Sequence, residues 1–138
     1  MTANELLTKI IKLRKAIDYR KAKIASLVAR AENTSANLTG MPHNPVKDPS
    51  PMATAIGRKV DLEAEVNMLT EERNTLIAQI DLVEDDDLAR LLNLRYAQEI
   101  NWDEIMAEMN YSHSWLFQLH RKAKEKLDKV LKDRTKKQ

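Results

Sequence analysis

Apolar residues recur at alternating steps of three and four along the first part of the chain. This period is typical of a helix that buries one stripe against a partner helix. Within residues 6–31 a single position of the stripe is charged, and it holds Arg20. The apolar members of the stripe are Leu6, Ile10, Leu13, Ile17, Ile24, Leu27 and Ala31. The pattern predicts a long helix of coiled-coil character.

The stripe returns further along the chain, at Leu62, Val66, Leu69, Leu76, Ile80 and Val83. One arginine interrupts it again, Arg73. Two matching stripes predict a helical hairpin over residues 1–83, formed within one chain or between two chains. Charged residues inside such a stripe can fix its register. The favoured interpretation is that Arg20 and Arg73 extend to the helix edge and pair with carboxylates such as that of Glu72.

Glycine and proline are confined to one short part of the chain. Both glycines and all four prolines lie within the segment from Gly40 to Gly57. Proline cannot continue a helix, so this composition predicts a Pro-rich loop at residues 34–53. Strands usually need glycine or proline at their turns, and the remaining sequence has neither. The sequence therefore predicts an all-α fold.

Residues 84–138 carry helix-start signals at three places. Asp85 and its neighbours can cap a helix that runs to Tyr96. Asn101, followed three residues later by a glutamate, resembles a capping box and predicts a short helix over 102–109. Asn110 suits a tight turn, and Ser112 can cap a last helix that runs to about Leu131. A short helix, a turn of about three residues and a long helix form a helix-turn-helix domain.

The last helix has two distinct faces. Its apolar stripe holds Leu116, Leu119, Ala123, Leu127 and Val130, which the helical period places on one side. In helix-turn-helix motifs the N-terminal part of the second helix enters the major groove. The candidate DNA-binding residues on the opposite face and its flanks are Ser112, His113, Ser114, Phe117, Gln118, Arg121, Lys122 and Lys124.

Three of these residue types suit the chemistry of DNA. The Gln118 amide has the geometry to read adenine, and the Arg121 guanidinium can read guanine or grip a phosphate. Ser112 and the free N–H groups behind it can hold a phosphate. Phe117 either contacts a thymine methyl group or packs on the N-terminal hairpin, and the sequence favours neither. Trp115 borders the apolar stripe, where a core position is the commoner outcome.

Charge is distributed unevenly although the net charge is only +2. Residues 112–138 hold nine basic and three acidic side chains, which would attract a phosphate backbone. The alternative is that these lysines form the solvated end of a helix, where cations favour the dipole. The basic C-terminal segment therefore makes double-stranded DNA the first candidate partner.

Other function classes find little support in the residues. There is no cysteine and no apolar run long enough to cross a membrane, so we expect a cytoplasmic protein without a membrane partner. No nucleophile stands beside a base, and no phosphate-cradling glycine loop is present. His113 and His120 lack a third ligand residue in the pattern. We therefore expect no enzyme, no cofactor and no metal site.

One stretch, residues 91–127, resembles the promoter-binding region 4 of sigma factors. It is more similar still to phage late-transcription regulators of the ArpU/RinA type, and the segment LTGMP at residues 38–42 resembles a loop of the same family. The resemblance implies sequence-specific DNA binding and regulation of phage genes. The matching residues are Leu91, Leu92, Leu94, Arg95, Tyr96, Trp102, Glu104, Ile105, Glu108, Met109, Tyr111, Ser112, Trp115, Leu119 and His120.

Three hypotheses of function follow. The first is a transcription regulator that binds double-stranded DNA through residues 84–138. Its N-terminal hairpin would then serve homo-oligomerisation, with a dimer favoured, or contact RNA polymerase. The second is a DNA-packaging protein similar to a small terminase, which a ring-shaped oligomer would distinguish. The third is a helical adaptor that binds protein and no DNA, and the aromatic side chains on the presumed reading face favour it slightly.

Overall fold

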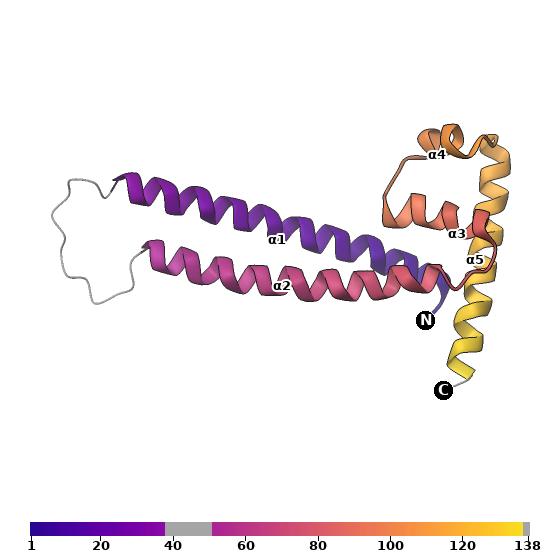
Figure 1. Ribbon diagram of the computed structural model, residues 1–138, viewed down its shortest axis with the longest axis horizontal. Coiled ribbons are helices and arrows are strands. Elements are labelled where there is room, and N and C mark those ends of the chain that lie inside the picture. The colour runs from indigo at the N-terminus through magenta and orange to yellow at the C-terminus, as the bar shows by residue number, and fades with distance from the viewer. Residues whose placement is uncertain (38–50, 137–138) are drawn as a thin grey trace. The chain divides into compact units, whose positions relative to one another are not determined.

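The computed structural model describes the backbone of residues 1–37 and 51–136, which form helices and no strand (Figure 1). This confirms the all-α fold class. The helices in chain order are α1 (Ala3–Asn37), α2 (Pro51–Ile80), α3 (Asp86–Leu92), the π-helix η1 (Asn93–Ala97), α4 (Trp102–Met109) and α5 (His113–Lys136).

The chain divides into two compact units, and these do not coincide with the predicted segments 1–83 and 84–138. One unit comprises Lys15–Glu71, and the other combines Met1–Arg14 with Glu72–Gln138. The boundary expected after residue 83 therefore falls inside the second of these units. The reason is that the first turns of α1 and the last turns of α2 belong with the C-terminal helices.

In the unit Lys15–Glu71, α1 and α2 run antiparallel within one chain (Figure 1). Ile17 and Leu62 of the two stripes are buried, and so is Ala55 of α2. Ile24 and Leu27 are only half-buried, so the stripe is less well covered toward the end of α1. Burial of apolar stripes is the main contribution to the stability of such a hairpin.

The two arginines that interrupt the stripes take different partners. Arg20 pairs with a carboxylate, as expected, because its Nε lies 3.0 Å from the Glu65 carboxylate. Arg73 donates to backbone carbonyls, as described below for η1. The carboxylate named for that role, Glu72, lies 3.0 Å from the Lys9 ammonium.

In the other unit, the N-terminal turns of α1 are tied to the C-terminal helices. Ala3, Leu6 and Ile10 have no exposed surface. The backbone N–H of Ala3 donates to the carboxylate of Asp128 on α5 at 2.6 Å. This bond satisfies one of the free N–H groups at the start of α1 and places a negative charge where the helix dipole favours it.

The Pro-rich loop expected at 34–53 lies largely outside the described residues. The described helices reach into both of its ends, since α1 continues to Asn37 and α2 begins at Pro51. Proline at the first position of a helix costs no backbone hydrogen bond, because that N–H would have no helical acceptor. Residues 34–37 and 51–53 are therefore helical, which differs from the expectation for these two ends.

The helix expected from Asp85 to Tyr96 changes type halfway. Asp85 caps α3 as expected, accepting from the Leu88 N–H at 3.2 Å. From Asn93 the backbone follows a π-helix, in which the Gln98 N–H donates to the Asn93 carbonyl at 2.9 Å. The chain then leaves η1 through Glu99, whose φ of 55° lies in the left-handed region. Single π-helical turns of this kind often accompany functional sites.

Candidate nucleic-acid interface

Three polar side chains define the ends of α4 and the start of α5. Asn101 caps α4, since its side chain accepts from the Glu104 N–H at 2.9 Å. Asn110 ends α4 in the left-handed conformation, with φ 58° and ψ 39°. Ser112 then caps α5 by accepting from the Trp115 N–H at 3.2 Å. All three roles confirm the sequence analysis, and together they produce a helix-turn-helix.

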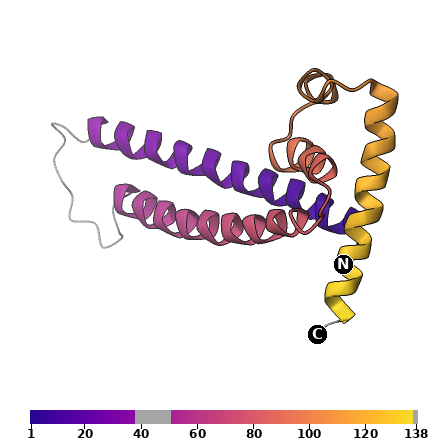
Figure 2. The same ribbon diagram turned by 45° about the vertical axis from the view of Figure 1, so that its right-hand side comes forward.

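An apolar cluster holds the helices of this motif together. It contains Leu91 of α3, Leu94 of η1, Ile105 and Met109 of α4, and Leu116 of α5. Figures 1 and 2 both show α3 beside α5 and α4 at the N-terminal end of α5. Because side chains from all four helices share one core, the orientation of α5 is set by packing on both α3 and α4.

The candidate residues gather on the N-terminal half of α5 and its cap. Seven of them are exposed, and Lys124 is half-buried. The opposite stripe is buried, with Leu116, Ala123 and Leu127 at zero exposure. The exposed candidates are Ser112, His113, Ser114, Phe117, Gln118, Arg121 and Lys122.

Phe117 sits at the edge of this exposed face. Its ring lies 5.0 Å from the ring of Trp102 and 4.4 Å from that of His113, measured between centroids. It retains 43% exposure. These two contacts are to α4 and to α5 itself. The His113 contact is edge-to-face and the Trp102 contact is tilted, and such contacts orient a ring while leaving part of it accessible.

Trp115 differs from the expectation of a core position. It is 47% exposed, and its ring meets the Tyr111 ring edge-on at 6.5 Å. The Tyr111 hydroxyl donates to the Asp87 carboxylate at 3.2 Å, and this hydrogen bond raises the pKa of the phenol. Sequence period placed Trp115 at the border of the apolar stripe, and the packing of the turn leaves it on the solvent side.

His120 lies behind the exposed face. Its Nε2 shares a hydrogen bond of 2.7 Å with the Tyr96 hydroxyl, and the Trp102 ring lies 5.1 Å away. Burial, followed by the positive charges of Lys124 and Arg95, lowers the pKa of His120 from its ordinary 6.5 to about 4. The imidazole is therefore neutral at pH 7 and acts as a packing and hydrogen-bonding group between α5, η1 and α4.

The lowered pKa of His120 predicts a pH-dependent stability. Protonation of His120 favours the unfolded chain. The contribution of the neutral His120 side chain to the free energy of unfolding is therefore complete above pH 6.5 and is lost as the pH falls toward 4. Because His120 is only partly buried, we expect a loss of about 1 kcal/mol across this window. Urea unfolding of the wild type and His120→Gln at pH 7.5, 6 and 4.5 measures it. The difference between the two proteins should shrink with falling pH, whereas a constant difference would contradict the lowered pKa.

Two arginines contact the helices of this motif, although the sequence analysis did not include them among the site residues. Arg95 lies over the Trp102 ring at 5.3 Å and donates to the Ile100 carbonyl at 3.2 Å. Arg73 donates from Nη2 to the Ala97 carbonyl at 2.8 Å. Its charge at an apolar stripe position was the signal in the sequence that Arg73 has a special role. Its acceptors could not be predicted, because they are distant in sequence.

Two further features of the described residues bear on function. Over residues 1–37 and 51–136, no group of three or more His, Cys, Asp or Glu side chains could hold a metal ion. No described helix is both long and apolar enough to span a bilayer.

Comparison with known proteins gives one match. Residues 52–128 match the profile of DUF1492, a family described as proteins of unknown function. No curated protein and no solved structure matches the chain. The matched residues cover more than half of the sequence and include α3, η1, α4 and most of α5. The chain therefore belongs to the DUF1492 family.

Proposed function

We propose that this protein is a DNA-binding transcription regulator that inserts the N-terminal half of α5 into the major groove of double-stranded DNA. The observation that carries the proposal is the division of α5 into a buried stripe and an exposed polar face. That face stands directly after a capped three-residue turn, which is the arrangement that helix-turn-helix proteins use to read DNA. The resemblance of residues 91–127 to sigma region 4 and to phage late-transcription regulators supports the same proposal.

The exposed side chains match the needs of DNA recognition. Gln118 presents an amide that can bond to adenine N6 and N7. Arg121 presents a fork that fits guanine or a phosphate. Lys122 and Lys124 would add salt-dependent attraction to the backbone. At the rim of the face, Phe117 is held by Trp102 with part of its ring free for a thymine methyl group.

The N-terminal hairpin has a supporting part in this proposal. Its two helices would serve oligomerisation or contact with RNA polymerase. A dimer would present two copies of α5 to half-sites about 34 Å apart, which predicts a palindromic target.

A second candidate function is a helical adaptor that binds protein. The exposure of Trp115 and Phe117 favours it, because exposed aromatic side chains are enriched at protein interfaces. Gel-filtration of the protein with and without DNA fragments at about 50 mM salt separates the two functions, since phosphate attraction is strongest there.

The DNA-binding proposal predicts the effects of two substitutions. Arg121→Ala should weaken binding to the selected DNA site by about 1–3 kcal/mol, because a charged fork is lost. Gln118→Ala should relax base preference at one position and leave binding to bulk DNA unchanged. The site is first selected from fragments of the genome that encodes the protein, at salt raised from about 50 to 200 mM. Affinities are then measured by fluorescence anisotropy.

The matched control is Arg58→Ala, which removes the same charge from an exposed position on α2. Its affinity should stay close to that of the wild type. If Arg121→Ala and Gln118→Ala both bind like the wild type, α5 is not the recognition helix. If the protein retains no fragment even at the lowest salt, the adaptor function replaces the regulator.

A further inference from the structure

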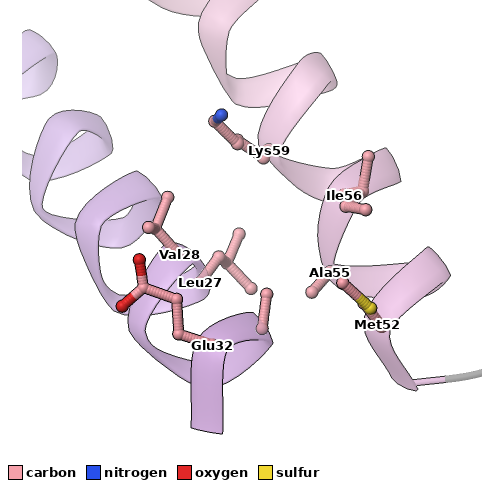
Figure 3. Close-up of a pocket in the computed structure, with 8 residues that line it drawn as sticks. Leu27, Val28, Glu32, Met52, Ala55, Ile56 and Lys59 are labelled. Atoms are coloured by element: carbon pink, nitrogen blue, oxygen red, sulfur yellow. The ribbon is translucent and has the colours of Figure 1, made fainter. Parts of the chain in front are cut away.

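The hairpin unit Lys15–Glu71 contains an apolar groove of about 360 Å³ between α1 and α2 (Figure 3). Leu27 and Val28 line it from α1, and Met52, Ala55 and Ile56 line it from α2. Two of the residues that line it, Ala31 and Ala55, have small side chains that leave space between the two helices. Apolar surface left in water at such a place favours a partner that covers it.

Exposed apolar side chains continue from the groove along α2. Met52 is 37% exposed, Ile56 49% and Val60 58%. Steps of four residues advance a helix by slightly more than one turn, so these three side chains form one short row. Ile56 belongs both to the row and to the groove wall. The row and the groove therefore make one continuous apolar surface, which we call the groove surface.

Opposite charges stand on the two sides of the groove. Glu32 lines it from α1 and Lys59 lines it from α2 (Figure 3). Lys59 lies 3.6 Å from Glu63 on its own helix, but both side chains are more than 40% exposed, so that pair is weak. In a two-fold contact through this groove, a pair between Glu32 of one copy and Lys59 of the other would occur twice. A surface that is complementary to itself in this way fits a symmetric dimer.

We propose that a second copy of this chain docks on the groove surface through a two-fold contact. In this contact Ile56 of each copy enters the groove of the other, and Glu32 of each copy pairs with the partner's Lys59. The proposal deepens the oligomerisation role suggested for the hairpin, and it does not depend on DNA binding.

The size of the groove surface sets the expected strength. Stable dimers bury about 800 Å² per partner. A row of three side chains beside one groove would bury less surface area than this. We therefore expect a dissociation constant in the micromolar range, near the weak end of specific association. Sedimentation velocity of the full chain from about 1 to 200 µM covers both sides of that range.

The first test compares two apolar-to-acidic substitutions on the same helix. Ile56→Asp places a carboxylate in the groove and should weaken dimerisation at least tenfold. The matched control is Met68→Asp, because Met68 is 72% exposed and does not line the groove. It should change the dissociation constant less than threefold. Circular dichroism of each variant verifies that the helix content is kept.

The second test uses charge reversal. Glu32→Lys and Lys59→Glu should each weaken the dimer several-fold, because each places like charges opposite one another twice. The double reversal should restore affinity, since it exchanges the two ends of the same pairs. Restoration requires contact between these residues, so a general loss of stability cannot produce it.

Three results would overturn the proposal. The first is a wild-type chain that stays monomeric to 200 µM, which would leave the groove surface to a different protein. The second is a dimer whose affinity is the same in Ile56→Asp and Met68→Asp. The third is a double reversal that is weaker than either single reversal. DNA binding is measured separately on the Arg121→Ala variant, which lies outside the groove surface, so failure of one proposal is distinguishable from failure of the other.

Discussion

Leu116→Ala should destabilise the C-terminal unit by about 3–5 kcal/mol, the largest effect expected of any single substitution here. Leu116 is completely buried and shares its cluster with side chains from α3, η1 and α4. Truncation removes its transfer energy and leaves a cavity, because α5 is held on two sides and cannot move to fill the space. The loss is comparable to the whole stability of many small domains.

Leu119→Ala is the matched control, since it makes the same chemical change one turn away. Leu119 packs against the same cluster but is only partly buried, so its truncation should cost about 1–2 kcal/mol. Urea unfolding followed by tryptophan fluorescence reports on this unit, because Trp102 and Trp115 both lie in it. Equal losses from the two variants would show that the described packing of α5 is wrong.

The helix-turn-helix itself could be predicted because its signals are local. Asn101 and Ser112 each bind a backbone N–H only three residues away. Asn110 adopts the left-handed conformation that its short side chain tolerates. These bonds depend on sequence neighbours alone, so a reading of the sequence finds them without knowing the tertiary structure.

The environment of the candidate site depended on contacts that sequence does not reveal. Trp115 lies on the solvent side because of how the turn packs, and the helical period left it at a border. The Tyr96 and His120 side chains meet across 24 residues, and no pattern joins them. The buried stripe of α5 was therefore predicted correctly at Leu116, Ala123 and Leu127, while the exposure of Trp115 was not.

The π-helix was the main local feature that the sequence concealed. Leu91, Leu92 and Leu94 fit a continuous α-helix, and no glycine or proline marks a change. A π-helical turn leaves carbonyls at its C-terminal end without helical partners. Arg73 reaches two of them, since its Nη2 lies 2.8 Å from the Ala97 oxygen and 3.5 Å from that of Tyr96. Its Nε also donates to the Ile10 carbonyl of α1 at 3.3 Å.

One guanidinium thus joins three segments of the same unit: α1, α2 and the end of η1. Its positive charge also stands where the dipole of a helix C-terminus is negative. A lysine could supply the charge but not the fork that bonds to separate carbonyls at once. The arginine at this stripe position is therefore explained by the backbone groups that it satisfies, in addition to its place between apolar neighbours.

Arg73→Met should consequently cost about 2–3 kcal/mol, because hydrogen bonds from a charged group to partly buried carbonyls are lost. Methionine keeps most of the apolar stem, so the loss reports on the guanidinium. Arg90→Met is the matched control: its guanidinium lies 3.9 Å from Glu108 with both side chains about half exposed, and it should cost less than about 1 kcal/mol. Amide hydrogen exchange should accelerate at Gln98 and Ile100, whose N–H groups bond within the end of η1, in Arg73→Met alone. Unchanged exchange at both amides would mean that η1 forms without Arg73, and that the arginine contributes only to the pairing of α1 with α2.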